Sequence, residues 1–361
     1  MKNIILLLSL CFVMSEAKST TPYAEATNIV WTVPEKKLPL PSTASAELQQ
    51  VLSQISPPNV KARSTFSAKS KQEWKDWAEY SALAGEEGAK SWAKKYNVTI
   101  KQDTIDGVNV YYVTPHSFAP LTSVSQKSKQ LFVYLHGGAY IFGGGLSGVN
   151  EAILIASRTN MPVISIDYRM PPDFPFPSGQ EDVVRVYKAL IKTYAPKSIA
   201  MGGSSSGAGL VLSTIHKLKA LKVELPGALF VGTPWSDLSK TGDSLYVNEG
   251  IDRKIVTYDG FLPEAVKLYA NGLDIKNEGL SPVYGDFSSF PPTMLVTGTR
   301  DLFLSMTVRV HRKMKAVGVE ADLNVYEGLS HVEYFVVPES PESKEVYHAL
   351  GLFLKQNLLI K

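Results

Sequence analysis

The sequence predicts an α/β fold with a mostly parallel central sheet and helices on both faces of the sheet. Short apolar runs alternate along the chain with amphipathic segments of helix length. Buried runs of this kind are typical of parallel strands that helices cover on both sides. The turn signal Asp106-Gly107 adds an antiparallel hairpin at one edge. The expected strands span 99–104, 108–114, 131–135, 163–166, 198–201, 228–231, 294–297 and 321–325.

The first 17 residues have the order of a secretory signal peptide. Lys2 supplies a positive start, residues 4–14 are apolar, and the small residues that follow predict cleavage after Ala17. We therefore expect an exported protein, periplasmic or secreted, with no stable membrane anchor after cleavage. The single cysteine, Cys11, lies inside this segment. The mature protein is thus expected to have no disulfide, no thiol nucleophile and no cysteine ligand for a metal.

Between residues 46 and 96, apolar residues recur at helical spacing and predict two aromatic-faced helices ahead of the first strand. The second of these carries Trp74, Trp77, Tyr80 and Leu83 at three-residue steps. An apolar face of this kind fits plain core packing and a lid over a substrate pocket equally well.

The motif Gly203-Ser204-Ser205-Ser206-Gly207 directly follows a predicted strand and opens a predicted helix at 207–221. A sharp strand-to-helix turn needs glycine on both sides, because a side chain there would collide with neighbouring backbone. The turn presents the Ser205 hydroxyl at the carboxyl end of the sheet, where the helix N-terminus favours negative charge. This context predicts that Ser205 is a nucleophile.

A second motif, His136-Gly137-Gly138-Ala139-Tyr140, follows the predicted strand 131–135. Glycines let successive amides turn towards one oxygen, and one such donor is worth about 3–4 kcal/mol to an oxyanion. We expect Gly137 and Gly138 to donate from this loop and Ser206 from the turn. Nucleotide binding is disfavoured, because the glycines match neither common phosphate-binding pattern. His136 precedes the nucleophile in the chain and is expected to be a structural residue of the loop.

A serine nucleophile needs a neighbouring base and an acid that orients the base. Of the six histidines, only His331 lies in a loop after a late predicted strand. Asp301 follows the strand 294–297 and lies between Ser205 and His331 in the chain, which matches a known Ser, Asp, His order. We therefore expect a catalytic triad of Ser205, Asp301 and His331.

These motifs resemble the hormone-sensitive-lipase-like family of bacterial carboxylesterases, which have the α/β-hydrolase fold. The likeness covers the chain from about residue 125 to the end. Besides the motifs above, it rests on Asp167-Tyr168-Arg169, Pro172, Pro175-Phe176-Pro177, Ser281-Pro282 and Pro291-Pro292. The sequence departs at Ser204 and Ser206, where the family commonly has G-D-S-A-G-G, and at Ala139, which replaces a third glycine.

The resemblance implies a carboxylic ester hydrolase that acts on short- to medium-chain acyl esters or lactones through an acyl-enzyme intermediate, with no cofactor and no metal. Some relatives remove acetyl groups, and others hydrolyse terpene lactones. It also implies that residues 167–177 brace the oxyanion loop and the turn. The expected parts are a signal peptide at 1–17, a leader and cap helices at 18–97, and a catalytic domain at 98–361 that adds to the cap near 237–280.

Two alternatives remain open from the sequence. An amidase or peptidase would use the same triad, and a ligand-binding protein on a hydrolase scaffold would have no turnover. Receptors within the family have lost the catalytic histidine, so the presence of His331 argues against the second alternative. The net charge of +3 comes from interleaved acids and bases, which gives no sign of a nucleic-acid partner. We expect a small-molecule ester or lactone as the partner, with a homodimer as one option for assembly.

Overall fold

The computed structural model describes residues 33, 35, 37–67, 70–118 and 130–359. The expected signal peptide at 1–17 and most of the leader lie outside these residues, so export stays a prediction. Contacts divide the chain into Met1–Pro39 and a compact unit, Leu40–Lys361. The second unit carries the helices and strands described below. None of the described helices has the length and apolar character needed to cross a membrane.

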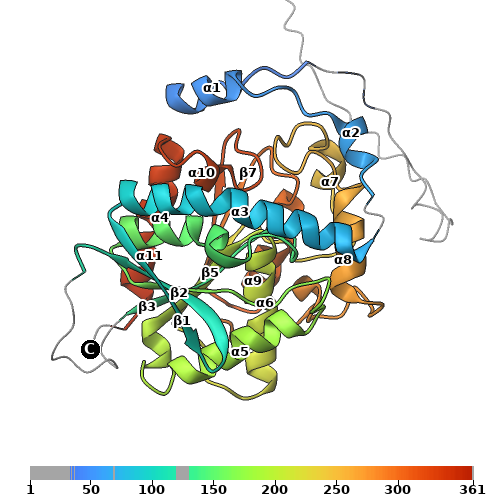
Figure 1. Cartoon of the computed structure of the whole chain (residues 1–361). Coiled ribbons are helices and arrows are strands. Elements are labelled where there is room, and N and C mark those ends of the chain that lie inside the picture. The colour runs from blue at the N-terminus through green and yellow to red at the C-terminus, as the bar shows by residue number, and fades with distance from the viewer. Residues whose placement is uncertain (1–32, 34, 36, 68–69, 119–129, 360–361) are drawn as a thin grey trace, which may run out of the picture. The chain divides into compact units, whose positions relative to one another are not determined.

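An eight-stranded sheet runs through this unit in the order β1-β2-β4-β3-β5-β6-β7-β8 (Figure 1). The strands are β1 (Val98–Ile105), β2 (Val108–Pro115), β3 (Leu131–Leu135), β4 (Val163–Ile166), β5 (Ile199–Ser204), β6 (Ala228–Gly232), β7 (Thr293–Gly298) and β8 (Ala321–Tyr326). β2 pairs antiparallel with β1 and β4, and the other pairs are parallel. The expected mostly parallel sheet with an antiparallel hairpin at its edge is confirmed, and each predicted strand overlaps an observed one.

Strand β3 shows why the predicted runs are apolar throughout. Leu131, Val133 and Leu135 belong to one buried cluster, whereas Phe132 and Tyr134 belong to a second cluster on the opposite face of the sheet. Successive side chains of a strand point to opposite faces, so a sheet covered on both sides buries every one of them.

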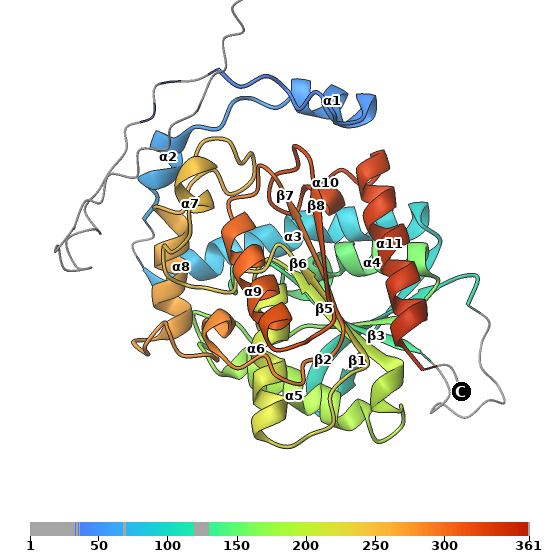
Figure 2. The same ribbon diagram turned by 180° about the vertical axis from the view of Figure 1, so that it is seen from behind.

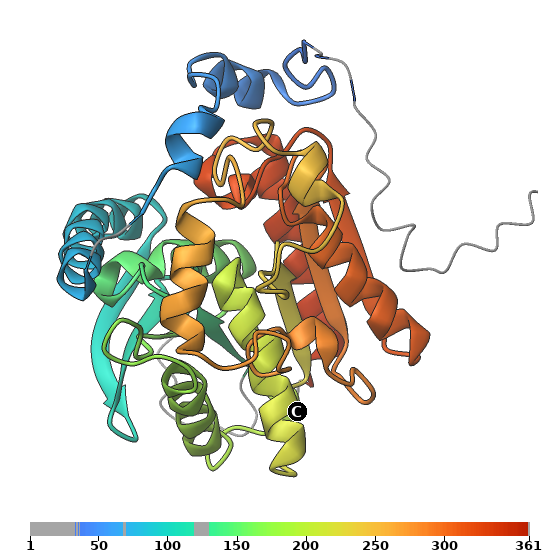
Figure 3. The ribbon, with the colours of Figure 1, turned by 90° about the vertical axis from the view of Figure 1, so that its right-hand side faces the viewer.

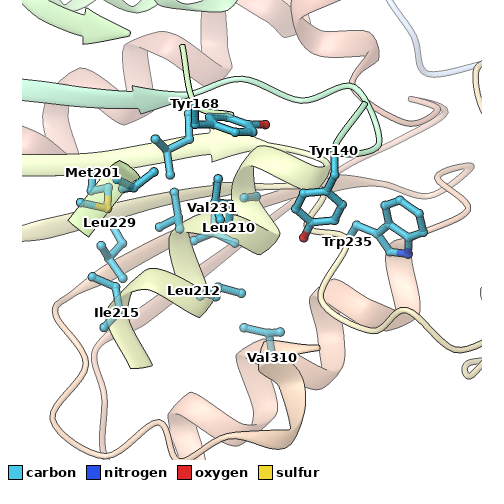
Figure 4. Packing of buried hydrophobic residues seen from close by; sticks show 14 of the residues in the cluster. Tyr140, Tyr168, Met201, Leu210, Leu212, Ile215, Leu229, Val231, Trp235 and Val310 are labelled. Carbon is cyan, nitrogen blue, oxygen red and sulfur yellow. The ribbon is translucent and has the colours of Figure 1, made fainter. Parts of the chain in front are cut away.

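Helices cover both faces of the sheet, as the views from opposite sides show (Figures 1 and 2). On one face lie α5 (Ser178–Leu190), α6 (Ser206–Ala220) and α9 (Leu304–Ala316), and on the other lie α4 (Asn150–Thr159) and α11 (Pro341–Asn357). Figure 4 shows the first of these layers, where Leu212 and Ile215 of α6 pack among Leu229 of β6 and Val310 of α9. This packing holds α6, and the turn that precedes it, against the centre of the sheet.

The remaining helices lie outside these two layers, and the first two of them, drawn in blue, are at the top of the view in Figure 3. They are α1 (Ala46–Ser53), α2 (Val60–Ser64), α3 (Lys71–Lys95), α7 (Ser244–Val247), α8 (Phe261–Ala270) and α10 (Glu333–Val336), with short 3-10 turns at η3 (Gly145–Val149), η4 (Pro196–Ser198) and η5 (Pro282–Tyr284). Three helices, rather than the expected two, precede the first strand.

The expected apolar stripe on the long helix α3 is wrong in its second half. Trp74 is buried, but Tyr80 and Leu83 are 76% and 62% exposed. The packed face continues instead through small residues. A Cβ on Gly85 would lie 2.6 Å from the Cβ of Ser147 in η3, which shows how closely the helix approaches its neighbour. Hydrophobicity alone favours the larger side chains and therefore selected the wrong face.

Candidate active site

The turn between β5 and α6 holds Ser205 in a strained backbone conformation. Its φ is +59° and its ψ is −126°, a region that residues with a side chain rarely adopt. A Cβ on Gly203 or Gly207 would lie 2.2 Å or 2.1 Å from the carbonyl oxygen of Leu135. The two glycines of the motif are therefore required by contact with β3, as the sequence predicts.

The loop 136–140, the expected oxyanion loop, lies against this turn. A Cβ on Gly137 would come within 2.9 Å of the Ser204 carbonyl oxygen and 3.3 Å of the Ser205 Cβ. Gly138 has a φ of +118°, and a Cβ there would lie 2.2 Å from the carbonyl oxygen of Phe142. Ser206 is the first residue of α6, so its N–H has no intrahelical acceptor. Gly137 and Gly138 border the same cavity as Ser205, and the role of these two residues and of Ser206 as oxyanion donors stays a prediction.

Tyr168 braces the loop from behind. Its hydroxyl donates to the carbonyl oxygen of His136 at 2.7 Å, and its ring stacks on the His136 ring at 4.3 Å between centroids. The neighbouring Asp167 accepts from the backbone N–H of Gly145 at 2.9 Å. Burial lowers the pKa of His136, which favours an uncharged ring. These contacts match the expected bracing role of the 167–177 segment and the structural place of His136.

Asp301 and His331 meet beside the turn. Nδ1 of His331 lies 3.1 Å from Oδ1 of Asp301, and both side chains are buried. Asp301 also accepts from the Thr297 hydroxyl and the Phe303 N–H, each at 2.8 Å, so its carboxylate is held on both oxygens. Nε2 of His331 is buried and has no hydrogen-bond partner among the described residues. The expected acid and base are therefore paired through the nitrogen that a triad requires.

Asp252 is a second buried carboxylate at this place, and sequence reasoning missed it. Its Oδ2 accepts from the backbone N–H of Leu302 at 2.7 Å and of His331 at 3.3 Å. Burial and the nearby charge of Asp301 raise the pKa of Asp252. It comes from a loop of the segment 237–280, where no motif marks it.

Glu151 on α4 is the second residue that the sequence did not reveal. It lies beside the residue that precedes Ser205, and its carboxylate accepts from Ser204 at 2.9 Å and from Tyr134 at 3.0 Å. Burial raises the pKa of its carboxyl to about 7. A lone glutamate in a predicted helix is ordinarily a surface residue, so its pattern carries no signal.

A cavity of about 760 Å³ opens at the turn that carries Ser205. Ser205, His331, Gly137 and Gly138 line it together with residues of α2, α3 and α8. Phe66, Trp77, Phe142 and Phe261 are aromatic residues of its wall. The buried Trp74 packs against all four of these rings, with centroids 5.6–6.4 Å away. Deeper in the core, Figure 4 shows the Tyr140 ring beside Trp235, another residue of the cavity wall.

The segment 237–280 also reaches this cavity, through Lys254, Ile255 and Phe261 among others. This placement is consistent with the expected second cap contribution, although the domain limits stay a prediction. Among the described residues, no group of three or more His, Cys, Asp or Glu side chains is arranged to hold a metal ion.

Comparison with known proteins gives concordant matches. Residues 132–335 match a family model described as alpha/beta hydrolase fold. The crystal structure of an esterase named E25 is 45% identical, with a TM-score of 0.87 over 91% of this chain and 99% of that one. An esterase from the bacterial hormone-sensitive lipase family is 27% identical, with a TM-score of 0.72 over 87% and 98% of the two chains. An acetyl-hydrolase of Streptomyces hygroscopicus is 26% identical over 66% of this chain and 80% of its own length.

Proposed function

Because the chain belongs to the alpha/beta hydrolase fold family, and within it to the hormone-sensitive-lipase-like serine carboxylesterases, we propose that Ser205, His331 and Asp301 are its catalytic triad. The observation that carries this proposal is the pairing of Asp301 with Nδ1 of His331, which leaves Nε2 free of other partners among the described residues. Ser205 lies on the strained turn in the wall of the same cavity.

In the first half-reaction, Nε2 of His331 takes the hydroxyl proton of Ser205 as Oγ attacks the ester carbonyl carbon. Asp301 holds the other ring nitrogen protonated and stabilises the positive charge that His331 acquires. The C–O bond to the alcohol then breaks, and His331 returns the proton to the departing alkoxide. The products of this step are a free alcohol and an acyl group bound to Ser205.

The negative charge on the former carbonyl oxygen is stabilised by the N–H groups of Gly137, Gly138 and Ser206. The positive end of the α6 dipole adds to this stabilisation. In the second half-reaction, His331 takes a proton from water, and the hydroxide attacks the acyl carbon. Collapse of this second tetrahedral intermediate breaks the bond to Oγ while His331 returns its proton to Oγ, which releases the acid and restores Ser205 and the neutral base.

The cavity supports a short- to medium-chain acyl ester or a lactone as substrate. Its volume of about 760 Å³ falls within the range of about 300–1,000 Å³ that is usual for small-molecule sites. Its aromatic wall favours an apolar acyl or alcohol group. A lactone would follow the same steps, except that the alcohol remains joined to the acyl group.

The test is release of nitrophenol from the acetyl, butyryl, octanoyl and palmitoyl esters, beside the Ser205→Ala variant. We expect turnover to peak at a short or medium chain and to disappear in the variant, with an unchanged melting temperature. Residual turnover at the wild-type rate in Ser205→Ala would remove Ser205 from the mechanism. Faster cleavage of a matched anilide than of the ester would favour an amidase.

A further inference from the structure

A chain of buried hydroxyl groups connects Glu151 with both sides of the active site. Ser204, which immediately precedes the nucleophile, lies 2.9 Å from Oε1 of Glu151 and 2.5 Å from the hydroxyl of Tyr334. Tyr334 belongs to α10, three residues after His331. These hydrogen bonds therefore connect Glu151 on α4 with Ser204 in the nucleophile turn and with Tyr334 on α10, the short helix that follows His331.

The direction of these hydrogen bonds follows from the carboxylate. An ionised carboxylate only accepts hydrogen bonds, so the Ser204 proton points to Glu151 and Tyr334 must donate to Ser204. Tyr134 and Tyr347 donate to the two carboxylate oxygens at 3.0 and 3.3 Å. Burial and the nearby Glu151 raise the pKa of all three tyrosines, which keeps them protonated as donors.

The backbone next to these hydroxyl groups leaves room for them. Ser204 pairs with Gly232 in the register of β5 and β6. A Cβ on Gly232 would lie 2.0 Å from the Tyr334 hydroxyl and 2.5 Å from the Ser204 hydroxyl. Only glycine at this position leaves room for the two hydroxyls to meet. The carbonyl of Gly232 also accepts from the Ser205 N–H at 2.9 Å, which links this position directly to the nucleophile.

We propose that Glu151 is a positioning residue for ester hydrolysis, because its carboxylate holds the nucleophile turn and the His331 loop at a fixed separation. The proposal rests on the catalytic roles proposed above for Ser205 and His331. Ser204 stands where the resembling family commonly carries an acid, and α4 brings a carboxylate to the same place from another part of the chain. A buried carboxyl is costly to ionise, so its three donors are needed to hold it in this form.

Protonation of Glu151 changes the directions of the hydrogen bonds in this chain of hydroxyl groups. The protonated carboxyl must donate one hydrogen bond, and no partner in the chain is oriented to accept it without turning its own hydroxyl. Because the pKa of Glu151 lies at about 7, this change falls in the working range of a neutral esterase. Two further ionisable groups face the members of this hydrogen-bond chain. Arg158 on α4 covers the Tyr347 ring at 5.4 Å, and the negative charge of Asp301 after β7 raises the pKa of Tyr334.

The experiment compares the wild type with Glu151→Gln and Tyr334→Phe on p-nitrophenyl butyrate between pH 5.5 and 8.5. Glu151→Gln keeps the shape of the side chain, and Tyr334→Phe removes only the donor on the His331 side. Tyr187→Phe is the matched control, because that buried tyrosine makes one hydrogen bond of 2.9 Å, to the Glu224 carbonyl oxygen, on a helix outside the cavity. Melting temperatures exclude loss of folding as a cause.

We expect both variants to lower kcat by about 10- to 100-fold at pH 8, since a displacement of about 1 Å costs about 100-fold, with KM changed less than threefold. The ratio of the wild-type to the Glu151→Gln rate should fall towards one as the pH drops below 7, because protonated Glu151 is itself neutral. Protonation of His331 affects both proteins and cancels in this ratio. The kcat of the double variant should be no lower than that of the more impaired single variant, because both changes break the same hydrogen-bond chain.

A wild-type kcat in Glu151→Gln, or a loss of equal size at pH 5.5 and pH 8, overturns the positioning role. So does an equal loss in the Tyr187→Phe control. These results differ from a failure of the proposed function itself. In that case Ser205→Ala would retain turnover, and a phosphonate ester would fail to label Ser205 in the wild type.

Discussion

Ionisation of Glu151 should make the folded protein less stable as the pH rises. Burial raises the pKa of this carboxyl from 4.5 to about 7. Below about pH 4.5 the group is protonated in both states and contributes nothing. Between the two values the unfolded chain releases the proton and the folded chain retains it, so a rise in pH favours unfolding. Each pKa unit is worth about 1.4 kcal/mol, so the cost reaches about 3 kcal/mol above pH 7.

The perturbation that isolates this cost is Glu151→Gln, which stays neutral at every pH. Urea unfolding of both proteins at pH 5, 6, 7, 8 and 9 gives the free energy of unfolding at each value. We expect the difference, wild type minus variant, to decrease by about 2.5 kcal/mol across this range, with most of the change between pH 5 and 7. Other buried groups, such as His136, are present in both proteins and cancel in the difference.

A difference between wild type and variant that is independent of pH would refute this reasoning. It would mean that the Ser204, Tyr134 and Tyr347 hydroxyls compensate fully for the loss of water around the carboxylate. A difference that grows with pH would mean that the donors outweigh desolvation and hold the pKa below its ordinary value. Either result is resolved by urea titration, because about 3 kcal/mol is a large fraction of the stability of a typical domain.

Three further predictions concern other parts of the site. Gly207→Ala should lower the melting temperature by several degrees and reduce activity, since its Cβ would lie 2.1 Å from a β3 carbonyl oxygen and overpacking costs about 1–3 kcal/mol; an unchanged melting curve would contradict this. Asp301→Asn should lower kcat by about 10⁴-fold with little change in stability, because His331 then adopts the wrong tautomer; a loss under tenfold would argue for another acid. Arg253→Met should lower the free energy of unfolding, measured by urea titration, by about 3–5 kcal/mol, because the buried Glu333 loses its charged partner and keeps the Ser330 N–H as a donor; the added change Glu333→Gln should recover part of the loss.

The sheet and the proposed site residues were predictable because each has a local signal. A short apolar run marks a strand buried on both faces, as in β3 to β7, whereas the Asp106-Gly107 turn signal marks the edge hairpin of β1 and β2. Ser205 stands out through its flanking glycines. Asp301 and His331 stand out because each follows a strand in the right order. In each case the structural requirement restricts residues that are close in the sequence, so it can be recognised in a single sequence.

Glu151 and Asp252 carry no such signal. Each is a single acid whose partners come from distant segments, and its burial follows only from how these segments pack. Tyr347, one partner of Glu151, lies 196 residues away in the chain. The packed face of α3 was mispredicted for a related reason. Small residues such as Gly85 let this helix approach η3 closely, whereas Tyr80, which is more hydrophobic, faces outward.

Two carboxylates, Asp252 and Asp301, lie close to His331, and they make different contacts with it. Asp301 reaches the ring, with Oδ1 at 3.1 Å from Nδ1. Asp252 binds backbone instead, accepting from the N–H of His331 and of Leu302, the residue after Asp301. Asp252 therefore connects the two loops that carry the acid and the base, and it cannot orient the ring. Substitution of Asp252 should therefore alter the conformation of both loops, whereas substitution of Asp301 should alter only the orientation of the His331 ring.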